Sequence, residues 1–108
     1  MEKALEASKN PANPEIFPAY QKRLGTIIKK LADLKGKDVN SFEVRELVGE
    51  YDFVTKQMFQ LPNVTDIVLE IADAYRTNPE IQAAQDSAYG EGTTEFIGRA
   101  MEAFYGKP

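Results

Sequence analysis

Apolar residues recur every three to four positions along most of the chain, which is the spacing of one face of an α-helix. The first such stripe predicts a helix over residues 18–35, with Pro18 in its first turn and Gly36 ending it. The predicted inward face of this helix consists of Phe17, Tyr20, Leu24, Ile27, Ile28, Leu31 and Leu34. No useful length of the chain alternates between polar and apolar residues, so the pattern predicts helices and no strands.

A second helix is expected to begin at Asn40 or Ser41, either of which can serve as its cap. Asn40 stands three residues before Glu43, which is the spacing of a capping box. The predicted inward stripe of this helix comprises Val44, Leu47, Val48, Tyr51, Val54 and Met58. Phe53 lies off that stripe, and residues 61–63 break the helix.

Three shorter helices are expected after this break. The third is capped by Asn63 or Thr65, and Asn78 caps a short fourth helix. The fifth covers residues 93–105 and ends at Gly106. The predicted inward residues of the third and fifth helices are Ile67, Val68, Ile71, Ala72, Tyr75, Phe96, Ile97, Ala100, Met101 and Phe104.

These patterns predict an all-α fold, a compact domain of four to five helices joined by short loops. Residues 1–13 include a turn cluster around Pro11 and are expected to form a flexible N-terminal segment. Residues 14–108 are expected to form a single helical domain. A length of 108 residues is enough for one hydrophobic core and no second one.

The composition excludes several kinds of chemistry. The chain has no Cys and no His, so it lacks a thiolate nucleophile, a sulfur ligand for metals and the commonest general base. An enzyme and a cofactor are therefore not expected.

Two of the predicted helices carry carboxylates at spacings of three to four residues. We interpret them as a helix face exposed to solvent, with a weak site for a hard cation as the alternative. These carboxylates are Glu43, Glu46, Glu50, Asp66, Glu70 and Asp73.

Charge is distributed unevenly along the chain. Residues 22–37 carry a net charge of +5, whereas residues 38–108 carry −8 and the whole chain −4. We interpret the first segment as a basic helix lying on an acidic body, with a basic patch for a phosphate backbone as the alternative. The acidic balance argues against direct contact with nucleic acid. No apolar run approaches the roughly 18 residues of a membrane span, and the first ten residues are charged, so a cytoplasmic location is expected.

Eleven residues are Phe or Tyr, which is more aromatic surface than a core of this size needs. Five of them stand at helix ends, in loops or off the inward stripes: Phe42, Phe53, Phe59, Tyr89 and Tyr105. Surplus aromatic side chains are typical of an apolar pocket or of a groove for a partner protein.

Residues 40–48 contain a Ser-x-Glu-Val-x-x-Leu pattern at the start of a predicted helix. Residues 71–81 contain a Tyr that is followed by an acidic residue, and residues 89–97 lead into the last predicted helix. These three stretches resemble the corresponding segments of the TipAS family of antibiotic-recognition domains. The resemblance covers about two-thirds of the chain.

The resemblance implies a globin-like, TipAS-like packing of helices that bind bulky hydrophobic antibiotics, thiopeptides among them, in a cleft. Such domains occur as effector domains of MerR-type transcription activators, so it also implies a role in transcription regulation and drug resistance. In the family arrangement the cleft residues of this chain would be Tyr51, Phe53, Met58, Phe59, Tyr75, Tyr89 and Phe96. Flexible segments would become ordered on the ligand and relay its binding to an attached module.

The sequence also departs from the family pattern. Residues 50–54 stand where the family often has His, and residues 61–64 contain none of the Cys that captures thiopeptides in some members. Covalent capture is therefore excluded. An aromatic-rich N-terminal segment and a MerR DNA-binding module are expected to be short or missing.

Two hypotheses follow. The first is a non-enzymatic domain that binds an antibiotic non-covalently, without a metal or cofactor. The alternative is a helical protein–protein interaction module, possibly a homodimer, in which the basic first helix pairs with an acidic partner.

Overall fold

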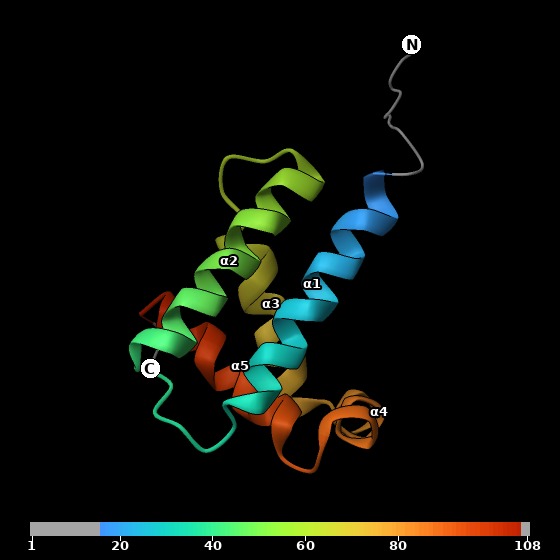
Figure 1. Cartoon of the computed structure of the whole chain (residues 1–108), viewed down its shortest axis with the longest axis vertical. Coiled ribbons are helices and arrows are strands. Elements are labelled where there is room, and N and C mark those ends of the chain that lie inside the picture. The colour runs from blue at the N-terminus through green and yellow to red at the C-terminus, as the bar shows by residue number, and fades with distance from the viewer. Residues whose placement is uncertain (1–15, 107–108) are drawn as a thin grey trace.

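The computed structural model describes residues 16–106, which form five α-helices joined by short loops (Figure 1). Their bounds are α1 (Ile16–Asp33), α2 (Phe42–Phe59), α3 (Thr65–Thr77), α4 (Pro79–Tyr89) and α5 (Thr93–Phe104). The described part of the chain contains no strand, so the predicted all-α class is confirmed. The expected flexible segment at residues 1–13 lies outside the described residues.

Local residues explain where several helices begin and end. The Asn78 side chain accepts hydrogen bonds from the backbone N–H groups of Glu80 and Ile81, at 2.9 and 3.2 Å, and so caps α4 as predicted. The segment after α1 turns at Gly36, whose φ of +96° suits a residue without a side chain. α2 ends differently, because Gln60 itself adopts a left-handed conformation with φ of 54°.

The predicted capping box at the start of α2 does not form. Ser41 occupies the N-cap position, but its side chain makes no capping hydrogen bond. At the start of α3 the predicted caps, Asn63 or Thr65, are wrong, because Val64 occupies the N-cap position and no side chain caps the helix. The Asn63 side chain instead accepts a hydrogen bond from the Thr65 backbone N–H at 2.8 Å, as in a turn that precedes the helix. Residue spacing thus identified Ser41 as the N-cap position of α2 but did not determine its rotamer.

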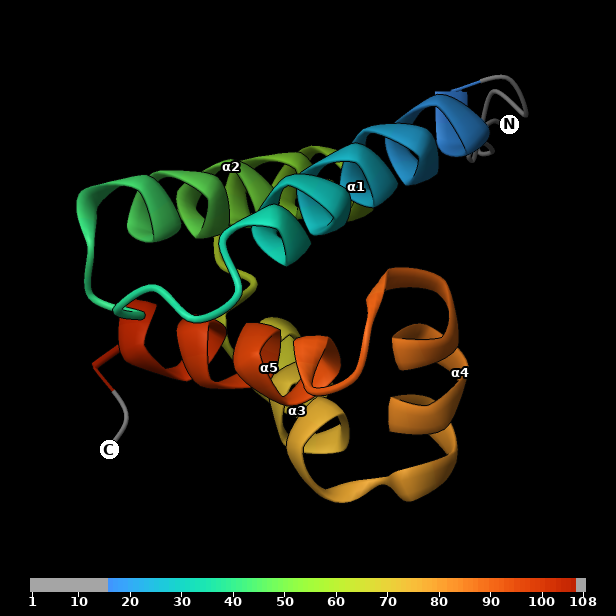
Figure 2. The ribbon, with the colours of Figure 1, turned by 60° about the horizontal axis from the view of Figure 1, so that its bottom comes forward.

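The five helices form two groups that meet on α5. α1 and α2 lie side by side and antiparallel, and α3 and α4 lie on the other side of α5 (Figures 1 and 2). α5 contacts every other helix, and its most extensive contact is with α3. Among the described residues, neither α1 nor α2 has a contact of comparable extent with α3 or α4. α5 is therefore the element that joins the two groups.

The hydrophobic core surrounds α5, which contributes the largest number of buried residues. α1 enters this core through Ile27, Ile28 and Leu31, all of which lie in its second half. Phe17, which the periodicity placed on the inward face of α1, is 46% exposed instead. It stands in the first turn of α1, beyond the part of that helix that packs on the core.

α3 and α5 approach each other closely at Gly98. A Cβ atom built on Gly98 would lie 2.9 Å from the backbone oxygen of Ala72 and 3.1 Å from Cβ of Tyr75. Backbone atoms cannot yield to such a contact, so the absence of a side chain at residue 98 permits this crossing. The crossing fixes the position of Tyr75, which is one of the predicted site residues.

Candidate functional site

The seven predicted site residues differ widely in accessibility. Tyr51 and Phe96 are core residues, with exposed fractions of 6% and 2%. Met58 and Tyr75 are half-buried. The exposed members are Phe53, Phe59 and Tyr89. A ligand could therefore contact five of the seven residues at the surface, whereas contact with Tyr51 or Phe96 requires the core to open.

Tyr75 of α3 lies within electrostatic reach of two other predicted tyrosines, Tyr51 of α2 and Tyr89 of α4. Burial raises the pKa of Tyr51 well above its usual range, and the neighbouring Tyr75 raises it further. Burial likewise raises the pKa of Tyr75, and Tyr89 adds a smaller increase. The hydroxyls of Tyr51 and Tyr75 thus remain protonated at neutral pH.

Tyr75 is held in place by two glutamines of α4. Gln85 donates a hydrogen bond from Nε2 to the Tyr75 hydroxyl oxygen at 2.9 Å, which partly offsets the effect of burial on the Tyr75 pKa. Gln82 donates from Nε2 to the Tyr75 backbone oxygen, also at 2.9 Å. The Tyr75 hydroxyl is therefore anchored as an acceptor of the Gln85 amide, and its own O–H group is still able to donate a hydrogen bond.

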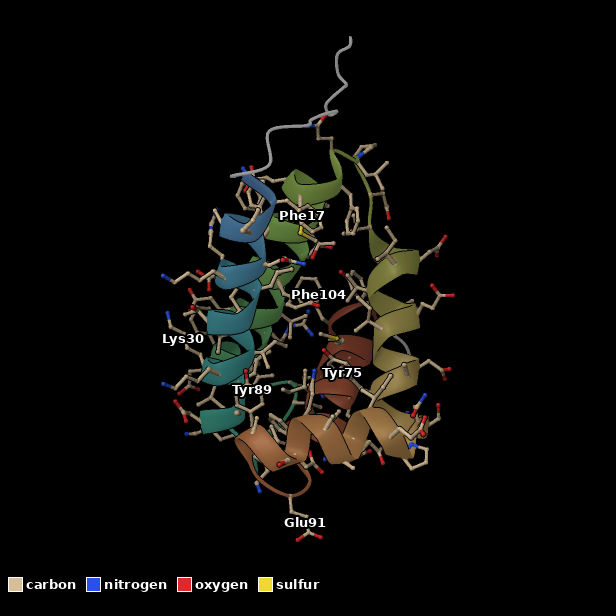
Figure 3. All side chains as sticks on the ribbon, turned by 90° about the vertical axis from the view of Figure 1, so that its right-hand side faces the viewer. Phe17, Lys30, Tyr75, Tyr89, Glu91 and Phe104 are labelled. Carbon is tan, nitrogen blue, oxygen red and sulfur yellow. The ribbon has the colours of Figure 1, made fainter. Side chains whose placement is uncertain are left out.

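One side of the molecule presents aromatic residues from three helices. Figure 3 looks onto the side on which α1 and α3 stand apart, with α4 below them, and Phe17, Tyr75 and Tyr89 lie on it. We call these three residues the aromatic face. Phe17 was expected in the core, and its exposure adds to this face a residue that sequence reasoning assigned elsewhere.

The loop between α4 and α5 positions Tyr89 on the aromatic face. Asp86 accepts hydrogen bonds from the Thr94 backbone N–H, the Thr94 hydroxyl and the Gly92 backbone N–H, at 2.9, 2.7 and 3.0 Å. These bonds, those from Thr94 above all, lower the pKa of the Asp86 carboxyl. Lys35 donates from Nζ to the Glu91 backbone oxygen at 2.6 Å and so ties the end of α1 to the same loop.

A second feature is an open groove between α1 and α2, with a volume of about 630 Å³. Phe53 is the only predicted site residue that lines it. The groove residues are Arg23, Thr26, Ile27, Lys30, Glu46, Gly49, Glu50, Phe53 and Val54. Sequence reasoning did not identify the other residues that line the groove. Gly49 was a signal for such a groove, because a glycine inside a helix leaves space on the surface of that helix.

The stacked carboxylates of α2 and α3 face solvent, as predicted. Within residues 16–106 no group of three or more acidic side chains is arranged to hold a metal ion. No helix in the same range is long and apolar enough to cross a membrane.

The fold and its exposed aromatic side chains define a small all-helical domain that presents an apolar surface on a rigid helical frame. The model of one protein family, the TipAS antibiotic-recognition domain, matches residues 2–104, nearly the whole chain. The chain therefore belongs to the TipAS family. No curated protein and no solved structure gave a significant match to the chain.

Proposed function

We propose that this domain binds a bulky hydrophobic antibiotic non-covalently on the aromatic face and the adjoining predicted residues. Membership of the TipAS family supports antibiotic recognition, and the exposed aromatic side chains of α1 and α4 on the same side of the molecule as the half-buried Tyr75 support this location (Figure 3). A chain without Cys has no thiol to bond to a thiopeptide, so binding depends on buried apolar area.

Two kinds of contact would hold the ligand. The rings of Phe17 and Tyr89 offer apolar area that is exposed to water and that a ligand would cover. The fixed hydroxyl of Tyr75 offers a donor that orients a polar group of the ligand. Tyr51 and Phe96 lie beneath the surface and would contribute by supporting these residues, or by direct contact when the ligand opens the core.

The domain would act as the ligand-sensing part of a MerR-type transcription regulator in the cytoplasm, with no catalytic step. A ligand that bridges α1 and the α3–α4 pair would stabilise one arrangement of the two helix groups. These groups meet mainly through α5, so such a shift in population is the signal that an attached module would receive.

A thermal-shift screen against thiopeptides and other large hydrophobic antibiotics tests the proposal. A ligand at 100 times its dissociation constant adds about 2.7 kcal/mol to the unfolding free energy, which is a rise of roughly 10 °C for a chain of this length. Tyr75→Ala and Tyr89→Ala should reduce the shift, and Phe42→Ala, which removes an exposed aromatic ring at the start of α2, should not.

Two results would contradict the proposal. A panel of such antibiotics that gives no shift would remove antibiotic binding as the function of this chain. A shift that survives Tyr75→Ala and Tyr89→Ala, but is lost in Phe53→Ala, would move the site from the aromatic face to the α1–α2 groove.

A further inference from the structure

The groove between α1 and α2 has walls of opposite charge. Its α1 wall carries Arg23 and Lys30, and its α2 wall carries Glu46 and Glu50. All four residues are exposed. None of the ion pairs formed within residues 16–106 joins one wall to the other. The charges of the two walls are therefore not used to close the groove.

The floor and one rim of the groove are apolar. Ile27 and Val54 are buried beneath it. Phe53 stands at the rim with 56% of its surface exposed, so covering its ring would favour association. Gly49 also lines the groove, and a Cβ atom at this position would lie 3.5 Å from the Phe104 ring. The groove thus joins exposed apolar surface to charges of both signs.

We propose that a second copy of this chain covers the groove, so that the domain forms a two-fold symmetric dimer through α1 and α2. An antiparallel helix pair with one basic and one acidic wall is self-complementary when a two-fold axis runs along the groove. The axis places the basic wall of one copy over the acidic wall of its partner. It also brings the two Phe53 rings together above the apolar floor.

The helix directions decide which charges would meet. α1 and α2 run antiparallel (Figure 1). Lys30 comes after Arg23 in α1, and Glu46 comes before Glu50 in α2, so Lys30 lies toward the same end of the groove as Glu46, and Arg23 toward the same end as Glu50. Rotation about an axis along the groove keeps each residue at the same height along the groove and places it opposite the other wall. Lys30 of one copy therefore pairs with Glu46 of the other, and each pair occurs twice in the dimer.

This dimer goes beyond antibiotic binding and uses a different surface. Lys30 points away from the side that carries Tyr75 and Tyr89 (Figure 3). A dimer through the groove would leave the aromatic face of each copy open. Failure of one proposal therefore does not decide the other.

Sedimentation equilibrium of the full chain, from micromolar to millimolar concentration at low ionic strength, tests the dimer. We expect a concentration-dependent monomer–dimer equilibrium that weakens as salt is added. Lys30→Glu and Glu46→Lys should each weaken dimerisation about tenfold, because symmetry doubles the effect of one surface charge pair. Phe53→Ala should weaken it as well.

The decisive measurement mixes the two charge-reversal variants. An equimolar mixture of Lys30→Glu and Glu46→Lys restores attraction at both contacts, so it should dimerise about as tightly as the original chain and more tightly than either variant alone. Lys29→Glu is the matched control, because Lys29 is an exposed neighbour on α1 that does not line the groove. Circular dichroism of each variant checks that it is folded.

Three outcomes would overturn the proposal. One is a monomer at every concentration in low salt. Another is a mixture that dimerises no better than its components. The third is an effect of Lys29→Glu as large as that of Lys30→Glu, which would mean that only net charge matters.

Discussion

Arg76 of α3 and Glu102 of α5 form an ion pair in which the guanidinium Nη1 lies 2.6 Å from the carboxylate Oε1. The Glu102 side chain is only 7% exposed, whereas that of Arg76 is 39% exposed. The hydrogen bond to Glu102 raises the pKa of Arg76. Burying a carboxylate is costly unless it is paired, so Arg76 is the residue that permits an acidic side chain beneath α3.

Arg76→Met should lower the free energy of unfolding clearly more than the removal of an exposed arginine does, because it leaves the buried Glu102 carboxylate without its cation. Arg99→Met is the control, since Arg99 makes an exposed i,i+4 pair with Glu95. This variant should lose about 0.5 kcal/mol or less of unfolding free energy. Urea denaturation measures both. Equal losses in the two variants would show that the burial of Glu102 has no energetic consequence.

Gly98→Ala should be destabilising by about 2 kcal/mol. The new Cβ would meet the Ala72 backbone oxygen at 2.9 Å and Cγ of Arg76 at 2.7 Å, and the helices would have to move apart. Gly25→Ala tests the same change in α1, where nothing lies within 4 Å of the new Cβ. That variant should be more stable by up to about 1 kcal/mol, because Ala favours helix over Gly. Thermal unfolding that ranked the two variants in the opposite order would contradict the close approach of α3 and α5.

The Asp86 carboxyl should make the stability of the domain depend on acid pH. Its pKa is lowered in the folded state by the bonds from Thr94 and Gly92, so its contribution is complete above the pKa of about 3.9 of an unfolded Asp. It is lost as the pH falls below that value through the folded pKa. Asp86→Ala should therefore be less stable than the original chain at neutral pH, and the difference should shrink below about pH 4.

Chemical denaturation at several pH values measures this difference. Asp33→Ala serves as the control, because it also removes one carboxylate, from an exposed residue at the end of α1 that lies outside the α4–α5 loop. If the difference in unfolding free energy between Asp86→Ala and the original chain stayed constant down to the lowest pH, the charge of Asp86 would not be what holds the α4–α5 loop.

Tyr105→Phe should lower the free energy of unfolding by about 1 to 2 kcal/mol. The Tyr105 hydroxyl donates to Oδ1 of Asp52 at 2.5 Å, and Oδ2 of the same buried carboxylate pairs with Lys56 at 3.0 Å. The substitution leaves one carboxylate oxygen without its donor. Tyr89→Phe, which removes the hydroxyl of an exposed tyrosine, should change stability little, and a loss of similar size there would argue against the special role of Asp52.

The same pair gives an expectation at alkaline pH. Burial, and then the hydrogen bond to Asp52, raise the pKa of Tyr105 in the folded state. The resulting stability is complete below the pKa of about 10 of an unfolded Tyr and is lost as the pH rises above it toward the folded pKa. The unfolding free energy should thus begin to fall near pH 10, and less so in Tyr105→Phe; identical alkaline profiles would exclude this linkage.

Local sequence signals predicted the helices well because they act within a few residues. Asn78 and Pro79 set the start of α4, since one supplies the acceptor and the other lacks the N–H that would need it. The 3.6-residue period identified the inward residues of α5 for the same reason. The candidate site was predicted from the resemblance, and its role in ligand binding stays a prediction. The periodicity had already placed Tyr51 and Phe96 on inward stripes and Tyr89 off them, as the structure has them, but it could not show which side chains of different helices share one side of the molecule.

The sequence by itself determined the all-α class, the five helices and the separation of a basic first helix from an acidic remainder. Only the tertiary structure decided that α5 joins the two helix groups, that Glu102 and Asp52 are buried, and that Phe17 is exposed. It alone revealed the groove with oppositely charged walls. The physical reason is that periodicity shows which face of a helix avoids water, whereas the partner of that face depends on contacts between residues far apart in the chain.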